Sequence, residues 1–171
     1  EVISSDEQSD LFEEAEKVSS KSLSLTMTLM PLESQDSLYD LGNGLERVTS
    51  LNSLTLTLNI YSKNDKLWAH DLGMALAKST SLNSLTLAIN IYSGRDSSST
   101  SSLYKTLAES TSLNSLTLAV NIYGDTDIAG TYLLDKTLAK CTSLSSLTLE
   151  INIYGSTDSI GTYLLVEDLA K

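Results

Sequence analysis

The eight residues TSLNSLTL occupy Thr80–Leu87, and the same letters stand at Thr49–Leu56 and at Thr111–Leu118. Thr142–Leu149 differs from them by one residue and reads TSLSSLTL. Successive copies begin 31 residues apart, and a constant period of this size is typical of proteins that stack equal structural units. A looser copy precedes these four. We therefore divide most of the chain into five units, 20–48, 49–79, 80–110, 111–141 and 142–171.

Each unit contains two hydrophobic periods. In its first half, leucines such as Leu54 and Leu56 alternate with small polar residues, which indicates a β-strand. In its second half, leucines recur four residues apart, which places them on one face of a helix. The strands are expected at Leu23–Leu29, Leu54–Ile60, Leu85–Ile91, Leu116–Ile122 and Leu147–Ile153. The helical pairs are Leu41 and Leu45, Leu72 and Leu76, Leu103 and Leu107, Leu134 and Leu138, and Leu165 and Leu169. Because one unit cannot bury its apolar side alone, we expect neighbouring strands to pair in parallel.

A family resemblance follows from the spacing Leu51-x-x-Leu54-x-Leu56-x-x-Asn59, which resembles the leucine-rich-repeat signature and recurs in the next three units. With a helix after each strand, the pattern is most similar to the ribonuclease-inhibitor subclass. The segment 130–144, GTYLLDKTLAKCTSL, resembles the helical half of the repeats in NOD-like receptors. The resemblance implies an α/β fold, a right-handed solenoid of five strand-helix units with a parallel sheet on the concave side and helices on the convex side. The chain departs from this subclass in two ways. Its period is 31 residues, whereas the subclass usually has 28 or 29, and a tyrosine stands two residues after the asparagine where the subclass has leucine.

The asparagine of the signature forms a column of equivalent residues, Asn59, Asn90, Asn121 and Asn152. A buried side-chain amide both donates and accepts hydrogen bonds, so stacked amides can pair with backbone groups where a strand leaves the sheet. We expect this structural role for the column. The first unit has Met30 at the position that we align with the asparagines, and we therefore expect no amide ladder there.

An acidic column precedes the helical halves of four units and consists of Asp65, Asp96, Asp127 and Asp158. An aspartate at that place can accept hydrogen bonds from the free amides of a helix's first turn. Calcium binding is the alternative, because stacked carboxylates repel one another and a cation relieves the repulsion. The variable neighbours of these residues favour helix capping over a metal site.

A tyrosine column, Tyr61, Tyr92, Tyr123 and Tyr154, follows the asparagines. Stacked structural rings are the favoured interpretation, and a ligand-binding stripe is the alternative.

Small polar residues alternate with the leucines and should lie on the outer face of the sheet, where leucine-rich-repeat proteins usually bind. This candidate binding face consists of Ser53, Thr55, Thr57, Ser84, Thr86, Ser115, Thr117, Ser146, Thr148 and Glu150, preceded by Ser24, Thr26 and Thr28. It lacks the tryptophan and arginine side chains that anchor many protein interfaces. Solvated strand residues are the plain alternative, and ordering of ice by threonine rows is a third.

The two ends of the chain differ in sequence. Residues 1–19 are strongly acidic and predict a helix, about Ser4–Val18, that covers the first unit. Nothing comparable follows the last strand, whose open edge would favour association. The predicted interface contains Leu147, Leu149, Ile151, Leu165 and Leu169. Contacts between like ends would close a dimer, whereas contacts between unlike ends would build a filament.

Composition narrows the class of function. The formal net charge is -11, with no basic cluster to bind nucleic acid, and no apolar run is long enough to span a bilayer. The sequence contains no recognisable catalytic motif and indicates no cofactor or metal. The lone Cys141 and the lack of a signal-like segment favour the cytoplasm without fixing the compartment. We expect a non-enzymatic domain that binds a protein, either as part of a receptor or as a scaffold. The alternatives are a self-assembling fibre subunit and an ice or mineral binder.

Overall fold

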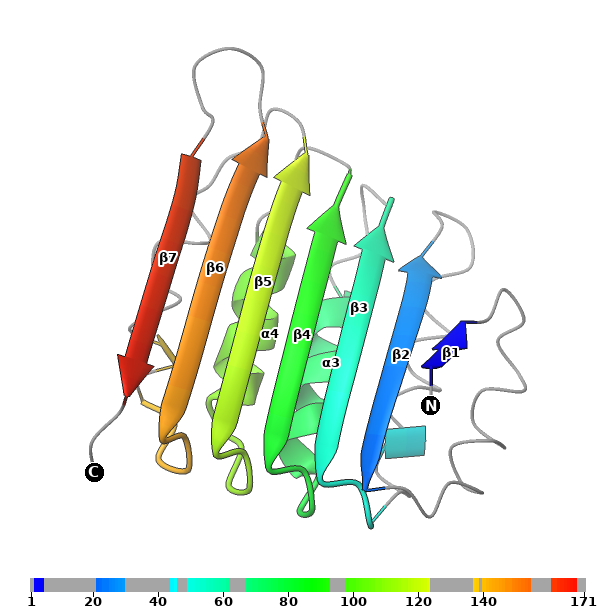
Figure 1. Ribbon diagram of the computed structural model, residues 1–171, viewed down its shortest axis with the longest axis vertical. Helices are drawn as coiled ribbons and strands as arrows, with labels where there is room; N and C mark the ends of the chain where they lie inside the picture. The colour runs from blue at the N-terminus through cyan, green and yellow to red at the C-terminus, as the bar shows by residue number, and fades with distance from the viewer. Residues whose placement is uncertain are drawn as a thin grey trace.

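The structure is a computed structural model, and it describes residues 2–4, 21–29, 44–45, 49–61, 67–92, 98–123, 137–138, 140–154 and 161–168. These residues form one sheet of seven strands in chain order (Figure 1). The strands are β1 Val2–Ser4, β2 Ser22–Leu29, β3 Ser53–Ile60, β4 Ser84–Ile91, β5 Ser115–Tyr123, β6 Ser146–Tyr154 and β7 Gly161–Asp168. Strands β1 to β6 run parallel, and β7 pairs with β6 in the antiparallel direction.

The predicted parallel sheet is confirmed for β2 to β6, which contain the five predicted strands. Equivalent residues lie opposite one another across all five strands, each 31 residues further along the chain, as in Leu54, Leu85 and Leu116. The inward leucines and isoleucines of the core are almost fully buried. Alternating hydrophobicity thus places every second side chain of each strand in the same apolar layer.

Two helices pack on one face of the sheet, α3 Leu67–Lys78 and α4 Ser98–Leu107, and Figure 1 shows them behind the central strands. The helical spacing is confirmed for these two units, because Leu72, Leu76, Leu103 and Leu107 are buried. Residues 44–45 and 137–138 are helical as well. No helix in the described part of the chain has the length and apolarity needed to cross a membrane.

The prediction for the last unit is wrong. Residues 161–168 form the strand β7 where the spacing of Leu165 and Leu169 predicts a helix, and Leu169 lies outside the described residues. The edge of β6 is therefore covered by β7 of the same chain along Ser146–Ile153. An antiparallel strand can return beside its predecessor after a short connection, whereas a parallel one needs a long crossover.

The N-terminal end also differs from its prediction. Val2–Ser4 forms the short strand β1 beside β2, so Ser4 does not begin a helix, and the rest of the predicted acidic helix lies outside the described residues. The first unit pairs with the second at an offset of 31 residues, with Ser22 opposite Ser53 and Thr28 opposite Asn59. The alignment of Met30 with the asparagine column is therefore wrong, because Thr28 stands opposite Asn59.

Candidate functional site

The face of the sheet opposite the helices carries the outward-pointing side chains of β2 to β6, and we call it the open face. Its residues fall into five columns, one residue from each of the four units that contain β3 to β6. These are Ser53, Ser84, Ser115 and Ser146; Thr55, Thr86, Thr117 and Thr148; Thr57, Ala88, Ala119 and Glu150; Asn59, Asn90, Asn121 and Asn152; and Tyr61, Tyr92, Tyr123 and Tyr154. All of them are partly or fully exposed. The predicted binding residues thus share one surface, and their use in binding stays a prediction.

The asparagine column is a continuous chain of hydrogen bonds. The Nδ2 of Asn90 donates to the Oδ1 of Asn59 at 2.8 Å, Asn121 donates to Asn90 at 2.8 Å, and Asn152 donates to Asn121 at 2.9 Å. At the other end Asn59 donates to the hydroxyl of Thr28 at 3.5 Å. A side-chain amide carries both a donor and an acceptor, which is what lets such a column extend from one unit to the next.

The predicted amide ladder is present, but its amides bond to one another on the open face, whereas pairing with backbone groups at a departing strand was expected. Strand β3 continues past Asn59 to Ile60, and the flanking Leu58 and Ile60 are both buried. Asn59 must therefore point away from the core, because successive side chains of a strand alternate between its two faces. The ladder also reaches the first unit through Thr28, where none was expected.

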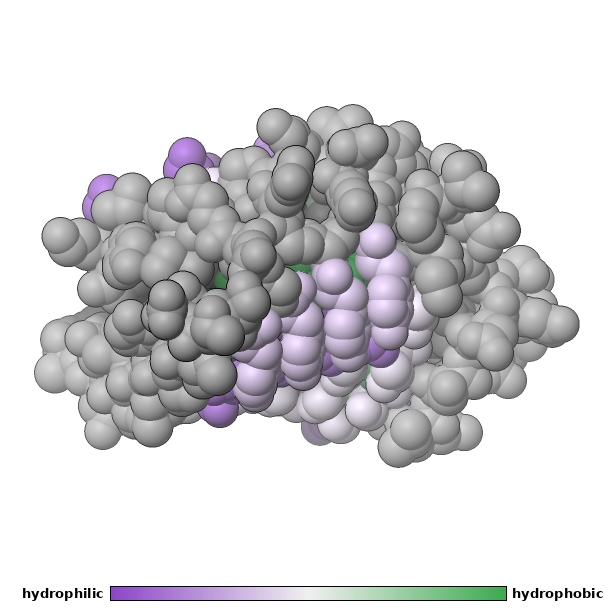
Figure 2. Space-filling view, turned by 90° about the horizontal axis from the view of Figure 1, so that it is seen from above, coloured by the Kyte–Doolittle hydropathy of each residue, from purple (hydrophilic) through white to green (hydrophobic). Residues whose placement is uncertain are grey.

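The tyrosine column is a stack of four rings at the C-terminal ends of the strands. Neighbouring ring centroids lie 4.4, 4.7 and 4.8 Å apart, with planes 7°, 5° and 9° from parallel. Figure 2 shows a row of plate-like side chains at this end of the molecule. Neighbouring strands usually rotate by about 20–25° relative to each other, and side-chain ladders are one device that keeps a sheet flat. The tyrosine and asparagine ladders together provide such a device here.

The ring stack also affects ionisation. The pKa of Tyr92 is raised above its ordinary value, first by desolvation and then by the neighbouring hydroxyls of Tyr61 and Tyr123. A charge on Tyr92 would lie beside two further phenols and would be less well hydrated, so its neutral form is favoured.

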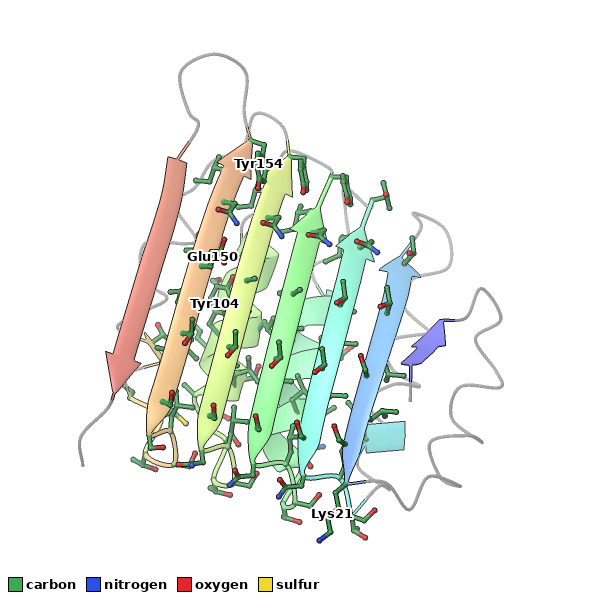
Figure 3. All side chains as sticks on the ribbon, in the orientation of Figure 1. Lys21, Tyr104, Glu150 and Tyr154 are labelled. Atoms are coloured by element: carbon green, nitrogen blue, oxygen red, sulfur yellow. The ribbon has the colours of Figure 1, made fainter. Side chains whose placement is uncertain are left out.

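Glu150 is the one acidic residue among the described outward positions of β2 to β6. It stands where the other units have Thr57, Ala88 and Ala119, and its Oε1 accepts a hydrogen bond of 2.8 Å from the Nδ2 of Asn152. Figure 3 shows Glu150 on the same strand as Tyr154 and further from the strand end. One end of the open face therefore differs in charge from the rest of it.

A second set of ladders joins the units at the starts of the strands, and the sequence analysis did not anticipate it. The backbone oxygen of Asn52 accepts hydrogen bonds from the backbone N–H groups of Asn83 and Ser84 at 2.9 and 3.0 Å. One unit later, the backbone oxygen of Asn83 accepts the same pair of bonds from Asn114 and Ser115. These bonds join backbone groups and persist where Ser145 replaces the asparagine, so the residue types gave no signal for them.

The serines at the helix ends link the units in the same way. The hydroxyl of Ser112 donates to the backbone oxygen of Ser79 at 2.6 Å, and that of Ser143 donates to Ser110 at 2.8 Å. Cys141 occupies the position of Ser79 and Ser110 in its unit and is buried. These contacts give the recurring serines a structural use that needs no ligand.

The aspartates Asp65, Asp96, Asp127 and Asp158 all lie outside the described residues, so helix capping and calcium binding both stay predictions. Within the described ranges, no group of three or more histidine, cysteine, aspartate or glutamate side chains is placed to hold a metal ion.

At the C-terminal end the described residues of the predicted interface contact their own chain, and association through this end stays a prediction. Leu147, Leu149 and Ile151 are all buried in the core of the chain itself, and Leu165 lies on β7 opposite Leu149.

No protein-family model matches the chain, and no curated protein or solved structure is significantly similar to it.

Proposed function

We propose that the chain is a leucine-rich-repeat-like solenoid domain without catalytic activity, and that it binds a protein partner through the open face. The observation that carries this proposal is the division of the sheet into two faces. One face is covered by α3 and α4, whereas the other displays five ordered columns of polar and aromatic side chains. A surface held rigid by its own ladders loses little conformational entropy when it binds.

Tyrosine supplies the contact energy that the small side chains lack. Tyr61, Tyr92 and Tyr154 expose 41%, 39% and 47% of their surface, and tyrosine is among the residues that contribute most to protein interfaces. Beside the rings, the serine and threonine columns offer a shallow surface with hydroxyl donors and acceptors. A partner with an apolar ridge beside polar groups would match this arrangement.

The test compares two exposed positions on opposite sides of the molecule. A photo-crosslinking amino acid replaces Thr117 on the open face or His70 on α3, and each protein is irradiated in an extract of its native source. We expect one dominant crosslinked protein from position 117, no equivalent product from position 70, and loss of the product on Tyr92→Ala. The same products from both positions, or none from 117, would rule the proposal out.

Self-assembly is the second candidate, and the sameness of the columns favours it. Ser84, Ser115 and Ser146 are equivalent, as are Thr86, Thr117 and Thr148, so the open face offers few distinct places for a single ligand. Irradiation of the purified protein distinguishes this candidate, because a product of twice the chain mass would come only from contact between copies. Sedimentation across a concentration series supplies the independent measurement, since a constant monomer mass would argue against assembly.

A further inference from the structure

Strand β7 occupies a place in the repeat where the earlier units are helical. Residues 161–168 lie 62 positions, or two periods, after residues 99–106, which fall within α4. Three periods earlier, residues 68–75 fall within α3. One period earlier, the equivalent stretch is 130–137, of which residue 137 is described and is helical. The last unit therefore departs from the others in conformation at a stretch where the period predicts a helix.

The different conformation of residues 161–168 is not explained by a different sequence in the last unit. Residues 162–171 read TYLLVEDLAK, and residues 131–140 read TYLLDKTLAK, so seven of the ten letters agree. Leucines four residues apart, Leu165 and Leu169, retain the helical period, while Thr162, Tyr163 and Val166 have high strand propensity. A segment whose local preferences are divided in this way adopts the conformation that its surroundings favour.

Strand β7 does not repeat the residues that build the open-face ladders. Thr162 stands opposite Asn152, and Gly161 stands opposite Ile153, where the register ends. No residue of β7 pairs with Tyr154, whose side chain is 47% exposed. Strand β5, in contrast, adds an asparagine that donates to the Oδ1 before it and a tyrosine that stacks on the ring before it.

We propose that the edge of β6 is a docking site for one more strand of the repeat's own pattern, Ser-Leu-Thr-Leu-x-x-Asn-x-Tyr, and that residues 161–168 become a helix when it docks. The incoming strand runs parallel to β6 and stacks a ring on Tyr154, as β5 stacks Tyr123 on Tyr92. Freed from the edge, residues 161–168 cover the apolar face of the sheet as α3 and α4 do. β7 thus protects an edge that would otherwise be open to pairing.

A second copy of the chain would offer its own N-terminal edge, which fits this site less well. Its β2 presents Thr28 where the pattern requires an asparagine, and residues Ser24, Leu25 and Thr26 of that strand already pair with β1. The site is therefore assigned to a further repeat unit and not to the chain's own N-terminal end. This assignment is independent of whatever the open face binds.

The test lengthens the chain by one unit in phase. One serine and then a copy of residues 111–141 are added after Lys171, which continues the 31-residue period. The matched control carries the same addition with prolines in place of the two strand leucines equivalent to Leu116 and Leu118, because proline removes ladder hydrogen bonds. The readout is the Cα chemical shift of each residue from 161 to 168, together with hydrogen exchange of the added strand.

We expect strand-type shifts in the original chain and in the proline control. In the lengthened chain the Cα secondary shifts of residues 161–168 should change sign to helical values, and the amides of the added strand should be protected. Strand-type shifts that persist in the lengthened chain would overturn the proposal. Helical shifts in the proline control would overturn it as well, because added length and not strand pairing would then be the cause.

Discussion

At the scale of single residues, two positions on the helices are tightly restricted by the atoms around them. Gly73 of α3 lies so close to α4 that an added Cβ would stand 1.7 Å from the Oγ1 of Thr106 and 2.9 Å from its Cβ. Tyr104 of α4 is fully buried, and its hydroxyl makes no hydrogen bond within the described part of the chain. Both positions can be tested without touching the open face.

Gly73→Ala should destabilise the protein, although the same change inside a helix ordinarily stabilises it by up to about 1 kcal/mol. The steric clash with Thr106 reverses the sign, and overpacking of this kind costs about 1–3 kcal/mol. The free energy of unfolding from urea denaturation is the measurement. In a Thr106→Ala background the cost should shrink, since the nearest atom is removed. An equal cost in both backgrounds would show that α3 and α4 do not meet at this point.

Tyr104→Phe removes a buried hydroxyl that lacks a partner, so the free energy of unfolding at pH 7 should stay the same or rise by about 1 kcal/mol. Burial raises the pKa of Tyr104 far above its ordinary value of 10.0, and the hydroxyl of Thr100, which lies nearby but outside hydrogen-bonding geometry, opposes the rise only in part. The unfolded chain therefore loses this proton first, so stability that is present below about pH 10 falls as the pH rises beyond it.

The phenylalanine variant should lose less stability between pH 9 and pH 11 than the original protein does, by about 1 kcal/mol or more. Tyr92 contributes in the same direction because its pKa is also raised, and it is unchanged in both proteins. Identical alkaline slopes would mean that the hydroxyl of Tyr104 is accessible to water.

At the scale of elements, the strands were predictable because their signal is local. Large apolar residues alternate with smaller or polar ones along each strand, and the large apolar residues are the ones that face the core and are buried. The orientation of Asn59 was also present in the alternation, since Leu58 and Ile60 flank it, but the family signature led to a different expectation. The β7 strand was not predictable, because Leu165 and Leu169 carry a helical period while other residues of the segment favour a strand. Pairing with the edge of β6 decides between helix and strand, and the residues of the segment itself do not reveal that edge.

The tyrosine ladder should stabilise the sheet through its ring contacts. Tyr61 and Tyr92 expose nearly equal fractions of their surface, 41% and 39%, but Tyr92 stacks on two rings and Tyr61 on one of the described rings. Aromatic pairs contribute about 0.5–1.5 kcal/mol each beyond burial. Tyr92→Ala should therefore lower the free energy of unfolding by about that amount more than Tyr61→Ala does. Equal losses would show that the rings do not stack in solution.

At the scale of the whole molecule, repetition explains both the fold and the regularity of the open face. Units of 31 residues place equal side chains in rows across the sheet, and those rows satisfy one another through amide bonds, ring stacking and backbone bonds at the strand starts. A surface built from such rows is regular, because successive units present nearly the same side chains at each step. The open face was predictable from alternation, whereas the closure of the C-terminal edge by β7 was not.

The central claim is that the repeat builds a parallel, in-register sheet with one open face, and nuclear Overhauser effects between backbone protons test it directly. The account predicts contacts between residues 31 apart along the threonine column, from Thr55 to Thr86, from Thr86 to Thr117 and from Thr117 to Thr148. Contacts in the antiparallel pattern within β2 to β6, or none between residues 31 apart, would contradict it.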